Sequence, residues 1–422
     1  MNDISANSAA GSAASSLGKA QSTDPRVVAM RQRLDRMEGF LREDPSNNAL
    51  LITAFETALS CGEWERAEFH MRQAQMLEAD VLGWRLREGD YWLAQQRYDE
   101  AQAVLEALAD TPQPPPGFID VLMHNRAFIE LRRGRHADCV GRLASMFEVQ
   151  AATSSAGAQP PVAARALQQL WLRALHHDGQ LERAMDWTRT AEKHGTLDAQ
   201  AAGIASLIAI DASDFGAAQR WCDASLGNGT LPEQPVEAFV TRASLALAQR
   251  DAAAASQFAD AALERHPTDG RAWSTRGFAF LLSGDLGQAY EAFRKALAIM
   301  GQHIGTWHGL GWTQILQGDL AGAQESFETA LALDRNFAES HGGLAVVLAM
   351  QARQGEAKEH VELALRLDRA NLSGRYAQAL LTGEVKDASD VQRFGRRILA
   401  GMPAPFGADL GDLIPSGAEE NG

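Results

Sequence analysis

The sequence is poor in cysteine and in aromatic residues. Its three cysteines, Cys61, Cys139 and Cys222, are spread over 422 residues without a CxxC pair, so the sequence predicts no disulfide framework and favours a reducing compartment. Each cysteine is expected to be a small core residue rather than a nucleophile. Aromatic residues make up only 7% while alanine is abundant, a composition that favours closely packed helices over a large β-sandwich.

Positive charge is also scarce. The chain has 39 Lys and Arg residues against 54 Asp and Glu, a net charge of −15, and no local basic patch stands out along it. Because a phosphate-binding surface needs concentrated positive charge, we expect no nucleic-acid partner. No charge-free apolar stretch reaches about 18 residues, so no membrane insertion is expected. The N-terminus lacks the apolar core of a secretory signal, and we expect a cytoplasmic protein.

Helix-length apolar segments alternate with short breaks from Pro25 to about position 400. The breaks are polar or contain glycine, as in LSGDL around Gly284 and LQGDL around Gly318. No segment shows the sustained period-2 alternation of a β-strand. The pattern predicts an all-α protein.

The strongest signal is an internal repeat with a period of about 34 residues. Equivalent residues at this spacing are Trp273 and Trp307, Gly277 and Gly311, Gly284 and Gly318, Ala289 and Ala323, Phe293 and Phe327, and Ala296 and Ala330. This pattern resembles the tetratricopeptide repeat (TPR), whose motif has the same period. The resemblance implies a TPR solenoid, a right-handed superhelix of antiparallel helix pairs, with repeats from about position 48 to 371.

Composition changes divide the chain further. Residues 1–23 are polar and of low complexity and are predicted to be a disordered N-terminal segment; residues 401–422 carry four acidic and no basic residues and are predicted to be a flexible C-terminal tail. Between them we expect an N-terminal block at 24–153, a loop or hinge at 154–164, and a C-terminal block at 165–400. The alternative is that 154–164 is a loop inserted in one continuous solenoid.

No catalytic or metal-binding motif is present. The sequence has no GxxxxGK[ST], GxSxG or HExxH. His176 and His177 are adjacent and would point about 100° apart on a helix, and His136 with Cys139 supplies only two possible ligands where a metal site normally needs three or four. We expect no catalytic residues, no metal and no cofactor, and therefore not an enzyme.

The TPR resemblance implies a concave groove lined by the first helix of each repeat. Carried onto this sequence it gives seven candidate partner-binding residues: Phe278, Leu281, His308, Trp312, Ile315, Val346 and Met350. Such an apolar lining is typical of a surface for a protein or peptide partner, while Trp273 and Trp307 are expected in the core. The competing interpretation is that these side chains pack between neighbouring helices. The lining has few cationic donors for a carboxylate, which argues against a clamp for acidic chaperone tails.

The favoured function is a non-enzymatic scaffold or chaperone-like adaptor that holds a partner segment in the groove. The alternative is an assembly factor, chaperone or exported protein of a bacterial secretion system, because the Ser- and Ala-rich residues 1–23 resemble non-cleaved export signals in composition. A helper domain for a separate enzyme is a third possibility. Loss of export with intact binding on deletion of 1–23 would favour the second function.

Overall fold

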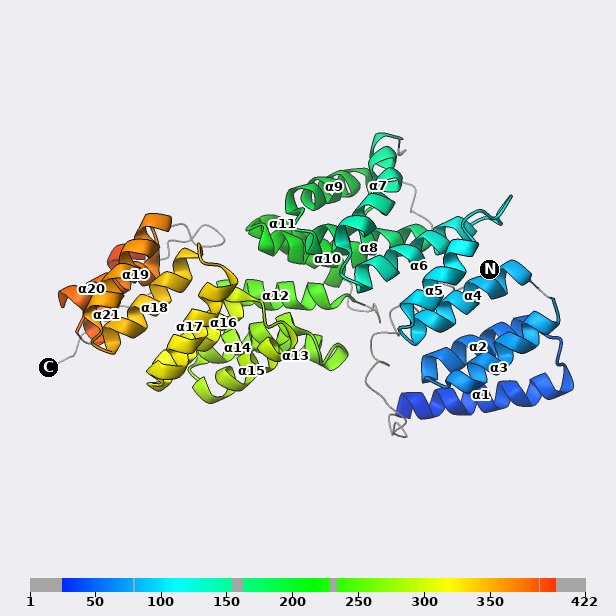
Figure 1. Ribbon diagram of the computed structural model, residues 1–422, viewed down its shortest axis with the longest axis horizontal. Helices are drawn as coiled ribbons and strands as arrows, with labels where there is room; N and C mark the ends of the chain where they lie inside the picture. Colours follow the sequence, from blue (N-terminus) through cyan, green and yellow to red (C-terminus); the bar gives the residue numbers. More distant parts are fainter. Residues whose placement is uncertain (1–24, 79, 154–161, 228–233, 387, 400–422) are drawn as a thin grey trace. The chain divides into compact units, whose positions relative to one another are not determined.

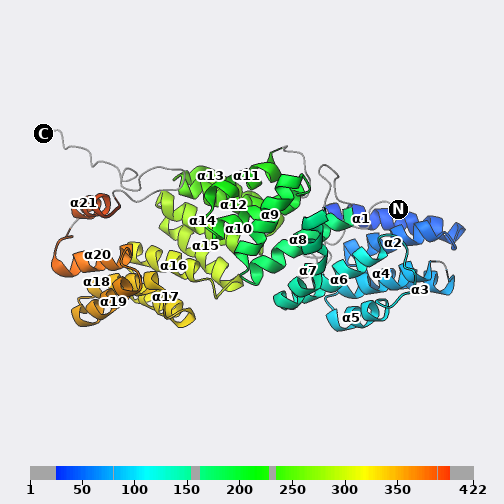
Figure 2. The same cartoon turned by 90° about the horizontal axis from the view of Figure 1, so that it is seen from above.

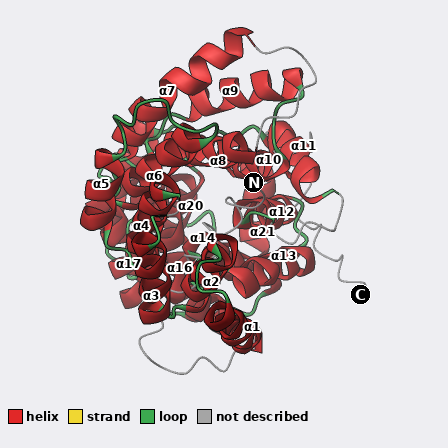
Figure 3. Cartoon of the chain, turned by 90° about the vertical axis from the view of Figure 1, so that its right-hand side faces the viewer, coloured by secondary structure: helices red, strands yellow, loops and turns green. Residues whose placement is uncertain are grey.

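The fold is built from helices alone. The computed structural model describes residues 25–78, 80–153, 162–227, 234–386 and 388–399. Within these residues there are 21 helices and no strand (Figure 3), which confirms the all-α prediction. No described helix is both long and apolar enough to cross a bilayer. The segments predicted to be disordered or flexible, 1–23 and 401–422, lie outside the described residues.

The chain forms two compact units, unit 1 at Met1–Ala205 and unit 2 at Ser206–Gly422, which can be followed by colour in Figure 1. The helices of unit 1 are α1 (Pro25–Glu43), α2 (Asn48–Cys61), α3 (Trp64–Met76), α4 (Val81–Ala94), α5 (Tyr98–Ala107), α6 (Phe118–Arg132), α7 (His136–Thr153), α8 (Val162–His177) and α9 (Leu181–His194). The boundary falls within α10 (Ala199–Asp211).

Unit 2 continues the alternation of first and second helices. Its helices are α11 (Phe215–Leu226), α12 (Val236–Ala248), α13 (Ala252–Arg265), α14 (Gly270–Ser283), α15 (Leu286–Ile299), α16 (Ile304–Gln317), α17 (Leu320–Leu333), α18 (Ala338–Met350), α19 (Gln354–Leu367), α20 (Leu372–Thr382) and α21 (Ala388–Leu399). α14 packs on α15, α16 on α17 and α18 on α19, and the first helices α14, α16 and α18 also contact one another in turn (Figure 2).

The first helices α14, α16 and α18 end in the same tight turn. Gly284 and Gly318 follow α14 and α16 with φ angles of 82° and 81°, in the left-handed region that glycine enters at no steric cost. Ala352 holds the equivalent position one repeat later with a φ of 61°. One period of the sequence is therefore one helix pair with its turn.

Glycines let the helices of unit 2 approach closely around a phenylalanine. The ring of Phe327 on α17 lies between Gly311 on α16 and Gly343 on α18. A Cβ added at Gly311 would lie 2.8 Å from this ring, and one at Gly343 would lie closer still. Phe293 has the same surroundings one repeat earlier. The sequence period thus reflects a repeated contact between one phenylalanine ring and the backbone of two glycines on neighbouring helices.

The first helices of unit 2 are also tied to the loops that precede them. Four side chains, each one repeat after the last, donate a hydrogen bond to the carbonyl oxygen six positions earlier. The pairs are Trp273 with Pro267, Trp307 with Gly301, His341 with Arg335, and Arg375 with Arg369. The two tryptophans expected in the core are consequently only half-buried, because their indole N–H groups face these loops.

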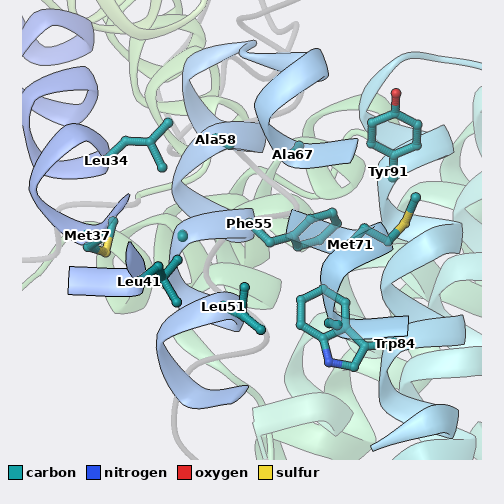
Figure 4. Close-up of a cluster of buried hydrophobic side chains, with 12 residues drawn as sticks. Leu34, Met37, Leu41, Leu51, Phe55, Ala58, Ala67, Met71, Trp84 and Tyr91 are labelled. Carbon is teal, nitrogen blue, oxygen red and sulfur yellow. The ribbon is translucent and has the colours of Figure 1, made fainter. Parts of the chain in front are cut away.

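The core of unit 1 contains larger side chains. Leu34 and Leu41 on α1 cover Leu51 and Phe55 on α2, and Phe55 meets the ring of Trp84 edge-on at 5.5 Å between centroids (Figure 4). Trp84 is fully buried, and its Nε1 donates to the side-chain oxygen of Asn48 at 2.8 Å. α1 therefore covers an apolar face that the helix pairs α2–α5 would otherwise leave open.

The proposed division at 154–164 falls largely on residues outside the described part of the chain. The helices on its two sides are nonetheless packed together, since α8 contacts both α6 and α7. The compact units separate later, between Ala205 and Ser206. The blocks 24–153 and 165–400 remain a prediction from composition.

Candidate functional site

The seven predicted partner-binding residues differ widely in exposure. Three are buried (His308, Ile315 and Val346), three are half-buried (Phe278, Leu281 and Trp312), and Met350 is exposed. The buried three cannot present their side chains to a partner, so for them packing between helices is the correct interpretation. Val346 has no exposed surface at all and belongs to the core cluster of α16–α20.

His308 shows why the position of a residue within the repeat does not predict whether its side chain is exposed. Its Nε2 lies 2.7 Å from the hydroxyl of Ser340 on α18, so the side chain links two first helices instead of facing solvent. Ser274 and Thr306 form the equivalent link between α14 and α16 at 2.9 Å. Burial, and secondarily the nearby His303, lower the pKa of His308 to about 4, which keeps the imidazole neutral at pH 7.

A different set of side chains does present apolar surface. Leu282, Leu316 and Met350 lie at the ends of α14, α16 and α18, each one repeat after the last, and are 37%, 60% and 46% exposed. We call these three residues the apolar row. Trp312 lies one turn before Leu316, half-buried, with its ring edge-on to Phe327 at 6.1 Å. Single exposed leucines are ordinary, but here the same exposure recurs in three successive repeats.

A second set of exposed aliphatic residues lies at the ends of the second helices. Ile299, Leu333 and Leu367 close α15, α17 and α19 at the same repeat spacing and are also exposed. Because the two helices of a pair run antiparallel, these residues lie at the opposite edge of the repeats from the apolar row. They provide a matched comparison for it in any experiment.

Unit 1 has a basic surface that the sequence reading missed. Arg97 follows α4, while Arg132, Arg133 and Arg135 lie at the end of α6 and in the turn after it. Arg97, Arg133 and Arg135 line an open cleft of about 590 Å³, and Arg132 contacts the same wall through Tyr98. The run RRGRH at 132–136 was the available signal, but its partner Arg97 belongs to the preceding helix pair.

The cysteines have no features of reactive thiols. All three are buried and unpaired. Burial raises the pKa of Cys139 to about 12 and that of Cys222 to about 11, so both thiols stay protonated at neutral pH and are poor nucleophiles. The prediction that they are core residues is confirmed.

Histidines meet in pairs within each unit. His136 on α7 stacks on His177 on α8, with 5.0 Å between ring centroids. In unit 2 the Nδ1 atoms of His341 and His360 lie 3.0 Å apart. His341 donates its other nitrogen to a loop carbonyl, so its Nδ1 accepts this bond in the neutral tautomer. Nowhere in the described part of the chain do three His, Cys, Asp or Glu side chains converge as metal ligands.

Comparison with known families gives a match for one of these helix pairs. Residues 304–337, which contain α16 and α17, match the family model described as "Tetratricopeptide repeat". The chain therefore contains a tetratricopeptide repeat. The match falls on the repeat whose glycine, phenylalanine and turn geometry are reproduced in the helix pairs on either side of it.

Several solved structures are similar to this chain. A monomeric mutant of IFIT1 with m7Gppp-AAAA is 12% identical, with a TM-score of 0.52, over 82% of this chain and 85% of that one. TTC0263, a thermophilic TPR protein of Thermus thermophilus, is 19% identical with a TM-score of 0.38, covering 44% of this chain and 100% of its own. YrrB, described as a TPR protein with an unusual peptide-binding site, is 15% identical with a TM-score of 0.33, over 45% and 96%. No curated protein matches this sequence.

Proposed function

We propose that this TPR protein is a non-enzymatic interaction scaffold, acting as a chaperone-like adaptor, that holds an apolar segment of a partner protein on the apolar row and Trp312. The observation that supports the proposal is the half-buried Trp312 one turn before Leu316, in a row whose exposed aliphatic side chains recur on three successive first helices. Nothing in the packing of the repeats requires apolar residues at these exposed positions. Exposed apolar side chains that gather on one face of a protein are typical of interaction sites.

The dimensions of the row fit a short peptide segment. Packed helices have axes about 8–10 Å apart, so three neighbouring first helices place the row's ends roughly 16–20 Å from each other. An extended segment of about five or six residues, or a helix of about 12 residues, spans that length. The partner segment should therefore carry two or three apolar anchors on one face.

Trp312 is the side chain expected to contribute most to binding. Its indole Nε1 has no hydrogen-bond partner among the described residues, while one ring edge is fixed against Phe327. A half-buried tryptophan can lose further apolar area to a partner at little rotamer cost, which is why this residue type is common among binding hot spots. Truncation of Trp312 to alanine should weaken binding by roughly 2 kcal/mol, about 30-fold.

Several parts of the functional prediction rest on the sequence alone. The secretion-system alternative depends on residues 1–23, which lie outside the described residues. The cytoplasmic location, the lack of a nucleic-acid partner and the absence of catalysis likewise stay predictions. Among these functions, the adaptor is favoured because Trp312 and exposed aliphatic side chains occur together on the first helices of successive repeats.

The decisive experiment compares charge placed on the two edges of the same repeat. Leu316→Glu changes the apolar row, and Leu333→Glu changes an exposed leucine on the opposite edge. Affinity purification of each variant from the source cell, with mass spectrometry, should recover the wild-type partner set with Leu333→Glu and lose it with Leu316→Glu. Circular dichroism should show both variants folded. Retention of the partners by Leu316→Glu, or their loss with Leu333→Glu alone, would place the binding surface elsewhere.

A further inference from the structure

The arginines of unit 1 form a locally positive cleft in a chain whose net charge is −15. The cleft opens at the turns that join α4 to α5 and α6 to α7. Its lining residues are Gln96, Arg97, Tyr98, Asp99, Glu100, Arg133 and Arg135. We call this surface, together with the adjacent Arg132, the arginine cleft.

Arg97 forms one wall of the cleft and is held in place by its neighbours. Its guanidinium lies 4.1 Å from the centre of the Trp92 ring, and its Nε donates to the carboxylate of Glu100 at 2.8 Å. The Arg97 contact lowers the pKa of Glu100, with a further contribution from a hydrogen bond to the backbone. The first turn of α5 thus already supplies one carboxylate to this arginine.

Arg133 and Arg132 form the facing wall. Arg133 donates to the side-chain oxygen of Gln102 at 2.9 Å and pairs with Asp99, while the Nε of Arg132 lies 3.3 Å from the hydroxyl of Tyr98. These bonds run between neighbouring repeats and fix the two guanidinium groups relative to α5. Little side-chain entropy remains to be lost when such groups bind a ligand.

Arg135 differs from the other three arginines. Its guanidinium makes no hydrogen bond or ion pair with any described residue, and the side chain is exposed. It borders the arginine cleft and also a second open cleft of about 560 Å³, and it directly precedes the N-terminus of α7 at His136. Helix N-termini carry partial positive charge, so α7 adds to the positive potential at this arginine.

The charges of the cleft do not cancel. Three arginines, Arg97, Arg133 and Arg135, line the cleft with two carboxylates, Asp99 and Glu100. The adjacent Arg132 adds positive charge, and Asp138 in the first turn of α7 offsets part of it. This surplus is small, and the rest of the chain is strongly negative. A long polyanion such as RNA would be repelled by that surrounding field, whereas a short segment with a few carboxylates would meet only the cleft.

We propose that the arginine cleft binds an acidic peptide segment of a partner protein, with carboxylates paired to Arg135 and to the exposed edges of Arg97 and Arg132. Carboxylate is the favoured ligand because Glu100 and Asp99 already show this group bound to arginines of the cleft, and a planar guanidinium binds a carboxylate through two parallel hydrogen bonds. The cleft belongs to unit 1 and differs in chemistry from the apolar row of unit 2, so it stands without the function proposed there.

The test uses a defined acidic probe and matched charge reversals in the full-length protein. The probe is a fluorescein-labelled peptide in which six glutamates alternate with glycines, and binding is followed by fluorescence anisotropy at about 50 mM ionic strength, where exposed charges are only partly screened. Arg135→Glu reverses the unpaired arginine. Arg366→Glu makes the same change of net charge at an exposed arginine on α19 that also has no ion pair to a described residue.

The wild-type protein should bind the probe with an affinity that falls as salt is added. Arg135→Glu should weaken binding about tenfold, Arg135→Ala by a smaller factor, and Arg366→Glu by less than about twofold. Equal affinities for wild type and Arg135→Glu would overturn the proposal. So would equal losses in Arg135→Glu and Arg366→Glu, because they would show a response to net charge alone.

Two competitors distinguish the acidic peptide from other anions. Inorganic phosphate at millimolar concentration should leave the peptide bound, and a ten-nucleotide polyadenosine RNA should compete weakly. Two results would contradict the proposal and assign the cleft to a phosphate group. In one, phosphate displaces the labelled peptide at a lower concentration than unlabelled peptide does. In the other, the RNA binds more tightly than the peptide and its binding depends on Arg135.

Discussion

Neighbouring helices are held together differently in α1–α3 of unit 1 and in α14–α19 of unit 2. In unit 1 ion pairs between separate helices, such as Arg66 with Asp35 and Glu38 at 2.7 and 2.8 Å, accompany buried links such as Trp84 with Asn48. In α14–α19 the links are buried and uncharged, such as His308 with Ser340. Surface ion pairs therefore supplement the buried contacts of unit 1, whereas the links named for α14–α19 are buried and uncharged.

The two regions also differ in regularity. Four left-handed turn residues of unit 2, Arg250, Gly284, Gly318 and Ala352, follow one another at a constant spacing, whereas the turns at Ser213 before them and Gly383 after them depart from it. In unit 1 the equivalent turns lie at positions 62, 96, 134 and 179, and the spacing between them grows along the chain. The central repeats of unit 2 therefore keep one length, whereas the repeats of unit 1 vary in length.

The largest expected effect comes from removing the buried phenylalanine ring at position 327 in unit 2. Phe327→Ala removes a fully buried ring that lies between two helices and should lower the free energy of unfolding by about 3–5 kcal/mol. Phe69→Ala, at a phenylalanine that is 64% exposed on α3, should cost well under about 1 kcal/mol. Urea unfolding measures both values, and hydrogen exchange should locate the loss in α14–α19. Similar costs for the two variants would show that Phe327 is not packed between α16 and α18 as described.

Acid should weaken unit 2 through His308. The pKa of this buried imidazole is about 4 in the folded chain against an ordinary value of 6.5, so between these pH values the unfolded chain binds more protons. The contribution of His308 to the free energy of unfolding is fully present above pH 6.5. It falls as the pH drops toward 4, by up to about 3 kcal/mol. Burial also lowers the pKa of His303 and His360, which act in the same direction.

The His308→Gln variant separates this contribution from that of the other histidines. Glutamine can still bond Ser340 but does not titrate, so the free energy of unfolding of the variant should fall less steeply as the pH drops through the range between the two pKa values of His308. Denaturant midpoints measured at several pH values give the slope. Identical slopes for wild type and variant would mean that His308 is solvated and does not link α16 to α18.

Salt should act mainly on unit 1. Arg66→Ala removes a half-buried guanidinium that bridges α3 to α1 and should cost about 1 kcal/mol at low salt. In about 1 M NaCl, where the screening length is roughly 3 Å, the cost should shrink. Arg72→Ala breaks only an exposed pair with Glu68 within α3 and should cost less than about 0.5 kcal/mol. A salt-independent cost for Arg66→Ala would show that its packing, not its charge, joins α1 to α3.

The smallest expected effect is a gain in stability. Ala352 takes a left-handed conformation that alanine adopts at a cost, so Ala352→Gly should raise the free energy of unfolding by about 0.5–1 kcal/mol. The control Ala349→Gly, in the last turn of α18, should lower it by up to about 1 kcal/mol. Thermal unfolding distinguishes the two signs, and a loss in both variants would place residue 352 outside the left-handed turn.

The sequence predicted the repeat but only part of the site. The repeat period was readable because Gly311 and Phe327 are residue types required by one recurring contact. The partition of the first-helix residues into buried and exposed was not, because it depends on how closely the next helix approaches. A Cβ at Gly342 would lie 2.7 Å from the backbone nitrogen of Gly374 on α20, and this approach is what leaves Val346 without exposed surface.

The basic cleft was unpredictable from sequence for a related reason. Its charge comes from two separate turns of the chain, and only the stacking of these turns brings Arg97 to the same surface as Arg135. The run RRGRH at 132–136 is basic, but the sequence does not show that Arg97 lies beside it. The composition therefore predicts a negative net charge for the protein, while the stacking of the repeats determines where positive side chains lie together.

The central claim is that a partner binds the apolar row and not the opposite edge of the same repeats. A photo-crosslinking residue, benzoylphenylalanine, can replace Leu316 in one protein and Leu333 in another, followed by irradiation in the source cell. The account predicts a covalent adduct with one partner protein from position 316, which disappears when Trp312→Ala is added, and no adduct from position 333. An adduct from position 333 alone, or equal adducts from both positions, would contradict it.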